Sequence, residues 1–420
     1  RQSKGDVKYV CCNADEGEPG TFKDRVLLER TPLAVIEGMV LAGYAVGARK
    51  GYLFLRGEYR DMAVLLETAI EAAKATGYLG RKIMGVSGFD FDITVVVSAG
   101  AYICGEETAL LNAIEGGRGE PRLRPPYPVT SGLYGKPTLI NNTETFAQAA
   151  AALRMDTEEY LALGDEISGG TKLIALSGMV RNPGVYEIPL GRISLKTLIE
   201  APEYGGGLHT ELPVQFFQMG GQSGPVGFPE QIYTPYGYQA LQSVGLTVGS
   251  GSIAVYDTSV SPVDYVRKVM EFFAHESCGK CTPCRVGTKR LLEKLDKITR
   301  GKGTLEDIDE LEQLCYYIKT NSLCGLGQTA PNPVLSTLKF FRDEYIAHIV
   351  DKRCPAGVCK KLLAYEIDPA KCKGCTLCAR TCPVGAIAGK VKEAHVIDKA
   401  KCIKCGACME KCKFGAISKK

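Results

Sequence analysis

The sequence lacks several features that would place the protein in a membrane or on a nucleic acid. No run of about eighteen apolar residues is free of charge, so no membrane-spanning helix is expected. No apolar stretch follows residues 1–8, so these residues are not expected to form a signal peptide. The formal net charge of +4 is too small to argue for a nucleic-acid partner. We therefore expect a cytoplasmic protein of ordinary globular composition, with neither membrane nor nucleic acid as a partner.

Cysteine is abundant by contrast, and its distribution favours metal binding. Eighteen cysteines in a secreted chain would indicate disulfides. Here many of them fall in Cys-x-x-Cys sets, and no export signal precedes them. This combination predicts metal-binding thiolates in a reducing cytoplasm.

The last fifty residues contain eight cysteines in two copies of the spacing C-x2-C-x2-C-x3-C. This spacing is the signature of bacterial ferredoxins with two [4Fe–4S] clusters, in which each fourth cysteine ligates the cluster of the other run. The predicted ligand sets are Cys372, Cys375 and Cys378 with Cys412, and Cys402, Cys405 and Cys408 with Cys382. A pair of zinc sites is the alternative, but zinc sites do not usually need this longer, repeated spacing. The segment therefore predicts electron transfer.

A third C-x2-C-x2-C run lies near the middle of the chain, in HESCGKCTPCR, and SLCGLGQ further along supplies a candidate fourth ligand. The predicted ligands of this third [4Fe–4S] cluster are Cys278, Cys281, Cys284 and Cys324. A structural zinc site is again the alternative.

Four further residues of metal-binding type remain after these assignments. They are Cys315, His348, Cys354 and Cys359. Together they would form a Cys3His set, a common closed zinc site that would join the helical region to the ferredoxin segment. The alternative is that they are unpaired buried thiols and a surface histidine.

The pattern of the chain predicts a multidomain protein that combines α/β and α+β folds. VKYVCC and FDITVVVSAG are typical of strands, and RDMAVLLETAIEAAKATG between them has helical periodicity. Ser261 and Pro262 are typical of the start of a helix. The predicted units are an α/β domain over 1–165, a β-grasp-like (SLBB) domain over 166–258, a helical bundle over 259–348, a linker with the zinc site over 349–363, and a ferredoxin domain over 364–420.

Several motifs in the first two thirds of the chain carry a family resemblance. They are CNADEGEPGTFKDR, GAYICGEETALL, PRLRPPYP and INNTETF, followed in order by HESCGKCTPCR and SLCGLGQ. This set resembles the NADH-binding flavoprotein subunits of respiratory complex I. The resemblance covers about residues 1–345 and implies a site for flavin mononucleotide (FMN) and NAD(H) in the α/β domain. The family's glycine-rich loop for the flavin phosphate precedes CNADEGEPG and is absent here, so we expect a chain that begins within this domain.

The residues support such a site on chemical grounds. Asn13, Asp15, Glu16 and Glu18 follow a strand, and open α/β sheets bind ligands at the carboxyl ends of their strands. By resemblance, FMN would contact Asn13, Asp15, Tyr102, Gly105, Glu106, Glu107, Asn141, Asn142 and Thr143, with Glu16 beside them. NAD(H) would contact Glu18, Arg124 and Tyr127, and the catalytic candidates are Glu18, Glu106 and Glu107. Alternatively, the paired glutamates are an ordinary helix start and the paired asparagines a turn.

The ferredoxin segment distinguishes this chain from the complex I subunit. The combination is similar to the β subunit of NAD-linked, electron-bifurcating [FeFe]-hydrogenases, or to that of NAD-dependent formate dehydrogenases. It implies FMN and NAD(H), in addition to the three [4Fe–4S] clusters and the zinc ion that the cysteine and histidine positions predict. It also implies a hetero-oligomer with a hydrogenase catalytic subunit, a small thioredoxin-like [2Fe–2S] subunit and ferredoxin. A non-catalytic electron-transfer scaffold is the alternative from another class, and the intact DEGEPG, GEET and INNTET motifs argue against it.

Overall fold

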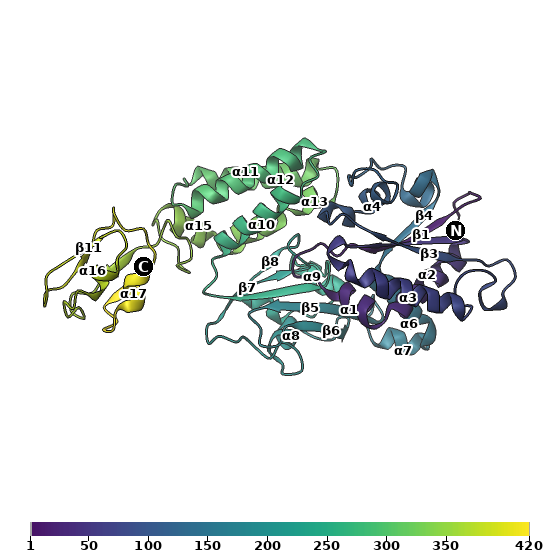
Figure 1. Cartoon of the computed structure of the whole chain (residues 1–420), viewed down its shortest axis with the longest axis horizontal. Coiled ribbons are helices and arrows are strands. Elements are labelled where there is room, and N and C mark those ends of the chain that lie inside the picture. Colours follow the sequence, from purple (N-terminus) through teal and green to yellow (C-terminus); the bar gives the residue numbers. More distant parts are fainter. Residues whose placement is uncertain (1, 420) are drawn as a thin grey trace.

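A four-stranded parallel sheet forms the first unit of the computed structural model, which describes residues 2–419 (Figure 1). Its elements are β1 Tyr9–Ala14, α1 Lys23–Arg30, α2 Pro32–Val46, β2 Lys50–Leu55, η1 Gly57–Tyr59, α3 Asp61–Ala75, η2 Ile83–Gly85, β3 Asp92–Val97, η3 Tyr102–Gly105, α4 Glu107–Ile114, α5 Pro128–Ser131, η4 Leu133–Gly135, β4 Thr138–Asn142, α6 Thr143–Arg154 and α7 Thr157–Ala162. The strand order is β3-β2-β1-β4, and every neighbouring pair is parallel. The direction of winding therefore reverses between β1 and β4, and such switch points open a crevice for a ligand.

Helix α3 shows how the sequence pattern produces this layer. It buries Met62, Leu66, Ile70 and Ala73, which recur every three or four residues and so share one face of the helix. The helix ends just before Gly77, whose φ of 77° lies in the left-handed region that glycine adopts without strain. Both features agree with the periodicity of the sequence.

The second unit is a mixed five-stranded sheet. Its elements are β5 Thr171–Gly178, β6 Gly184–Pro189, α8 Leu195–Glu200, β7 Val214–Met219, β8 Val226–Gly227, η5 Pro229–Tyr233, α9 Tyr238–Ser243 and β9 Ser252–Asp257. The order is β6-β5-β9-β7-β8, with β5 and β9 parallel and the other neighbours antiparallel. The mixed sheet agrees with the β-rich pattern of this segment, and its classification as a β-grasp-like domain stays a prediction.

A helical unit follows, and the loop that bears Cys278 and Cys281 contacts the first unit, because Arg118 donates to the carbonyl of Cys278 at 2.7 Å. Its elements are α10 Pro262–Glu276, α11 Thr282–Thr299, α12 Glu306–Asn321, α13 Gly325–Thr329, α14 Asn332–Phe340 and α15 Arg342–Ile349. The start of α10 agrees with the sequence, because Ser261 Oγ accepts a hydrogen bond from the N–H of Asp264 and Pro262 occupies the first turn.

The terminal unit is built from two similar halves. Its elements are β10 Tyr365–Ile367, α16 Leu377–Thr381, β11 Ile387–Ala388, β12 Val396–Ile397, α17 Ala407–Lys411 and β13 Ile417–Lys419. Strand β10 pairs with β13, β11 pairs with β12, and the two short helices are adjacent. This unit lies beyond α15, at the opposite end of the molecule from the amino terminus (Figure 1).

The distribution of buried apolar residues separates the terminal unit from the rest. One continuous core includes Phe54 and Leu110 of the first unit, Phe216 of the second and Val266 of the helical unit. The terminal unit has a small core of its own. No helix within residues 2–419 is both long and apolar enough to cross a membrane.

Candidate functional site

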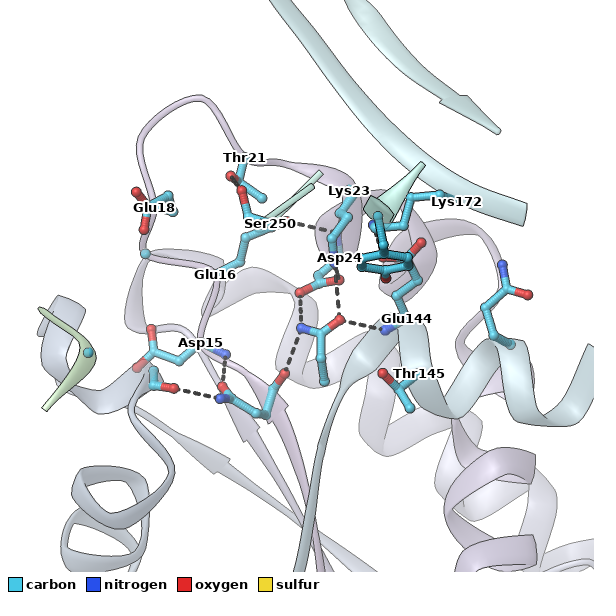
Figure 2. Close-up of a pocket in the computed structure, with 18 of the residues that line it drawn as sticks. Asp15, Glu16, Glu18, Thr21, Lys23, Asp24, Glu144, Thr145, Lys172 and Ser250 are labelled. Carbon is cyan, nitrogen blue, oxygen red and sulfur yellow. Dashed lines mark hydrogen bonds and ion pairs between the residues drawn. The ribbon is translucent and has the colours of Figure 1, made fainter. Parts of the chain in front are cut away.

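A large cavity opens where β1 and β4 end, at the switch point of the parallel sheet, and residues of the second and helical units complete its lining. Asn13 and Asn142 are neighbours in the register of these strands. Asn13 donates a hydrogen bond to the carbonyl of Gly105 at 2.8 Å and accepts one from the N–H of Asp15 at 3.2 Å. The cavity has a volume of about 850 Å³, within the range of small-molecule sites. Figure 2 shows the acidic loop, which carries Asp15, Glu16 and Glu18, and the charged side chains around it.

The structure brings many of the predicted flavin-site residues to this cavity, although not all of them. Those that line it are Asn13, Asp15, Glu16, Glu18, Tyr102, Gly105, Glu106 and Asn142. The predicted residues Glu107, Arg124, Tyr127, Asn141 and Thr143 are not among those that line it. Thr143 is fully buried, and its hydroxyl donates to the carbonyl of Asn13, so its contacts lie beneath the cavity floor.

Asp15 and Glu16 are buried carboxyls with different surroundings. Burial raises the pKa of Asp15 to about 7, although a hydrogen bond from Ser98 opposes the shift. Burial, followed by the charge of Asp24, raises the pKa of Glu16 to about 7 as well. The Glu16 carboxylate accepts the backbone N–H groups of Asp24 and Arg25 at 3.0 and 3.2 Å. Glu16 thus holds the start of α1, which leaves Asp15 the more available of the two for a ligand.

Glu18 connects the acidic loop to the second unit and to η3. Its carboxylate accepts a hydrogen bond from the hydroxyl of Tyr102 and another, at 2.7 Å, from the backbone N–H of Ser223. Burial raises the pKa of Glu18, and these bonds oppose the rise. The carbonyl of Ser223 in turn accepts a 3.0 Å bond from the side chain of Asn332 in the helical unit. A residue predicted to touch NAD(H) therefore lies where three units meet.

The paired glutamates have separate roles. Glu106 is the N-cap of α4, and its carboxylate accepts the N–H groups of Thr108 and Ala109, both at 2.9 Å. Glu107 forms a 2.5 Å ion pair with Arg124 on the surface beside the cavity. The ring of Tyr127 is 56% exposed. The helix-start alternative therefore describes Glu106, while Glu107, Arg124 and Tyr127 form an accessible outer rim.

A buried network of charges at the cavity was not predicted. Lys23 lies 2.5 Å from Asp24 and 3.1 Å from Glu144, and Lys172 pairs with the same Glu144. Burial lowers the pKa of Lys23, but the charges of Asp24 and Glu144 outweigh it and the net shift is upward. The network joins α6 of the first unit to β5 of the second, as Figure 2 shows. Lys23, Asp24 and Glu144 lie within the family motifs CNADEGEPGTFKDR and INNTETF. The sequence around Lys172, by contrast, contains no motif that would predict its place in the network.

The first set of cluster cysteines surrounds a small cavity next to the large one. Its lining includes Cys278, Cys281, Cys284 and Cys324. Ile103 and Leu326 line both cavities and so form a thin apolar wall between them. The structure thereby places the predicted cluster site directly behind the predicted flavin site.

The terminal unit has two further small cavities, each with four cysteines. One is lined by Cys372, Cys375, Cys378 and Cys412. The other is lined by Cys382, Cys402, Cys405 and Cys408. These are the two sets that the repeated spacing predicts, with each fourth cysteine contributed by the other half of the unit.

Spacing of the sulfur atoms distinguishes a cluster from a single metal ion. Four sulfurs around one zinc ion lie about 3.8 Å apart, because each Zn–S bond is about 2.3 Å long. Within residues 2–419, only His348, Cys354 and Cys359 form a group of three or more ligand atoms that all lie within 4.8 Å of one another. None of the three four-cysteine sets meets this criterion among the described residues.

The compact group itself has the chemistry of a zinc site. His348 is fully buried, and its Nδ1 donates to the carbonyl of Glu344 at 2.7 Å, which directs the Nε2 lone pair toward Cys359 Sγ at 3.3 Å. The hydrogen bond between the two sulfurs lowers the pKa of Cys354 and raises that of Cys359. Cys315, the predicted fourth ligand, is not part of the group, because α12 buries it in the core of the helical bundle.

Fold and site together define a modular iron–sulfur protein whose ligand pocket lies beside the first of three cysteine-lined cavities. Family models match in the same order: the Nuo51 FMN-binding domain over residues 1–151, the iron–sulfur binding region of NADH-ubiquinone oxidoreductase F over 264–348, and a 4Fe-4S dicluster domain over 364–413. The chain belongs to the family of NADH-quinone oxidoreductase F subunits. This confirms the family indicated by the motifs.

Individual relatives match over most of the chain. The NADP-reducing hydrogenase subunit HndC of Solidesulfovibrio fructosivorans is 48% identical over 393 residues, which are 94% of this chain and 79% of that protein. The F subunit of the NADH-quinone oxidoreductase of Escherichia coli is 42% identical over 82% of this chain and 76% of its own length. A crystal structure of an NAD+-reducing [NiFe]-hydrogenase in the H2-reduced state matches 83% of this chain, with 38% identity and a TM-score of 0.76. The chain spans 57% of that structure's chain.

Proposed function

We propose that the chain is the flavin- and iron–sulfur-containing subunit through which a hydrogenase complex exchanges electrons with NAD(H) or NADP(H). The observation that carries the proposal is the shared wall of Ile103 and Leu326, which separates the large cavity from the first four-cysteine cavity. A group in the large cavity and a cluster behind it would be close enough for electron transfer without intervening solvent. The order of the matched family domains supports the same route.

Flavin, when bound, supplies hydride exchange with a nicotinamide and single-electron exchange with a cluster. The amides of Asn13 and Asn142 would hold it at the end of the sheet, since each can donate and accept hydrogen bonds. Asp15 would face it with a carboxyl whose pKa is near neutrality. The outer rim of Glu107, Arg124 and Tyr127 would receive the nucleotide, with the guanidinium directed to phosphate and the ring to adenine.

The terminal unit provides a second group of electron carriers beyond the first cluster. We propose two [4Fe–4S] clusters there and three in the whole chain. We also propose a zinc ion held by His348 of α15 and by Cys354 and Cys359 of the linker. The partners would be a hydrogenase catalytic subunit, a small [2Fe–2S] subunit and ferredoxin. In that setting the enzyme would bifurcate electrons between two acceptors; a formate dehydrogenase partner would use the same subunit in the same way.

Anaerobic mixing of NADH or NADPH with the flavin- and cluster-loaded protein tests the proposal. We expect bleaching of the flavin absorbance, followed by the electron paramagnetic resonance signals of reduced clusters. In Cys278→Ala/Cys281→Ala, bleaching should persist while the signal of the first cluster disappears. Cys315→Ala is the matched control, because it removes a buried thiol outside the four-cysteine cavities.

Failure of both nucleotides to bleach bound flavin would refute the enzyme proposal and favour the scaffold alternative. If bleaching occurs but the first cluster stays oxidised, the proposed route through the Ile103 and Leu326 wall is wrong. Isolation of the native complex would identify the catalytic partner.

A further inference from the structure

A separate cavity lies between the helical unit, the linker and the terminal unit, far along the chain from the flavin pocket. It has a volume of about 410 Å³. Its lining comes from the end of α11, from residues 352–365 and from the ferredoxin segment, where it includes Cys402. Apart from Cys402, which is also a predicted cluster ligand, no residue of this lining has a role in the sites described above.

The charge of the cavity lining is entirely positive. Arg300, Lys352, Lys361, Lys399 and Lys404 line it, and no aspartate or glutamate is among the described residues that do so. Carboxylates from outside the lining neutralise two of these charges: Asp296 lies 2.8 Å from Arg300, and Glu366 lies 2.9 Å from Lys399.

The other three lysines of the lining form no ion pair with a carboxylate among the described residues. The ammonium groups of Lys352 and Lys404 donate to the backbone carbonyls of Gly303 and Lys361, which satisfies hydrogen bonds without neutralising charge. Like charges that converge on a concave, partly enclosed surface focus a positive potential there. Such an arrangement favours an anion, and the predicted cluster that Cys402 ligates supplies only part of the negative charge.

The floor of the cavity has a different character from its rim. Leu362, Leu363, Tyr365 and Ile397 line it and are each at most 8% exposed. An apolar floor with a ring of lysines suits a ligand that carries phosphate at one end and a flat apolar group at the other. Lysine binds phosphate as a point charge, and the volume lies in the range of small-molecule sites.

We propose that this cavity binds a phosphate-bearing small molecule of the nucleotide class, distinct from the nucleotide at the flavin pocket. Because the lining is contributed by three segments, the ligand would bind with full affinity only when the terminal unit has the orientation seen here. By linkage, the bound anion would stabilise that orientation. The site would therefore couple the concentration of a phosphorylated metabolite to the position of the two terminal clusters.

Titration calorimetry on the flavin- and cluster-loaded protein tests the proposal, with pyrophosphate and with ADP as probes. Lys361→Glu/Lys404→Glu should weaken pyrophosphate binding by about tenfold or more, because each reversal exchanges an attraction for a repulsion. The charge-conserving Lys361→Arg/Lys404→Arg should keep it. Lys390→Glu/Lys413→Glu is the matched control, since both lysines are exposed on the same unit but outside the cavity.

The two probes separate the parts of the ligand. ADP can also bind at the flavin pocket, but only the linker cavity is changed in the double variant, so the difference between wild type and variant isolates it. If the part of the binding that the double variant loses is tighter for ADP than for pyrophosphate, the ligand of the linker cavity is a nucleotide. If Lys361→Glu/Lys404→Glu does not retain its iron, Lys361→Gln replaces it. Absence of pyrophosphate binding at millimolar concentration, or equal binding by variant and control, would overturn the proposal; the lysines then only balance the charge of the nearby cluster.

Discussion

Glu144 offers the most direct test of how the first two units are held together at the cavity. Its carboxylate pairs with Lys172 and with Lys23, and accepts the N–H of Leu173 at 2.8 Å. Glu144→Gln keeps the size and the hydrogen-bond acceptor but removes the charge. Lys172 is only 8% exposed and has no second carboxylate within ion-pair distance among the described residues. We expect the free energy of unfolding to fall by about 3–5 kcal/mol, the usual cost of a buried charge left without its partner.

A double variant distinguishes the cost of losing the Glu144–Lys172 ion pair from the cost of leaving the buried charge of Lys172 without a partner. Glu144→Gln/Lys172→Met removes both charges, so we expect it to recover most of the loss and to lie within about 1–2 kcal/mol of wild type. Burial, and then the neighbouring charge of Lys23, already lower the pKa of Lys172. In the single variant this lysine should therefore deprotonate more readily, and the destabilisation should shrink as pH rises through the alkaline range.

Urea unfolding followed by circular dichroism measures these differences. Glu37→Gln is the matched control: it breaks the exposed Glu37–Arg154 pair, which also joins two helices of the first unit, and should cost no more than about 1 kcal/mol. The reasoning is refuted if Glu144→Gln is as stable as this control. It also fails if the double variant is no more stable than Glu144→Gln.

The remaining predictions concern Asp15 and the metal sites. The pKa of Asp15 is about 7 in the folded chain, compared with 3.8 for an ordinary, solvated aspartate. Between these two pH values the folded state binds more protons than the unfolded state, so the free energy of unfolding falls as pH rises from about 4 to 7. In flavin-free protein, Asp15→Asn should remove up to about 4 kcal/mol of this fall, as measured by urea unfolding between pH 4 and 7. If the free energy of unfolding depends on pH in the variant as it does in wild type, the raised pKa does not belong to Asp15. Cys324→Ala should lower the iron content from about twelve to about eight atoms per chain, whereas Cys315→Ala should leave it unchanged; equal iron in both variants would remove Cys324 as a ligand. His348→Ala should abolish bound zinc in elemental analysis, and a retained stoichiometric ion would exclude this histidine.

The parts of the site that the sequence predicts best are those with short, rigid spacing. Three cysteines at intervals of three residues form one loop, so their convergence follows from the chain itself. The exchange of Cys382 and Cys412 between the two halves also follows, because the spacing leaves each run one ligand short. The strands and helices of the first unit were predictable for a similar reason, since periodicity records which face is buried.

The parts that the sequence does not predict depend on contacts between units. Lys172 has an ordinary strand setting, and only the packing of β5 against α6 brings it to Glu144. Cys315 illustrates the opposite case. It follows Ile308 and Leu311 and precedes Ile318 at intervals of three and four residues, so the periodicity of α12 marks it as a core position. That signal was present in the sequence and favours packing over metal binding.

The apolar core that the first three units share does not extend past the linker, and this affects how the protein responds to oxidative loss of its clusters. Oxygen and peroxide attack iron–sulfur clusters, and the terminal unit has only a small core with which to survive their loss. The other three units share one large core, to which the two terminal cluster sites do not contribute. Damage confined to the terminal unit should therefore leave the other three units folded and remove only the proposed second group of electron carriers.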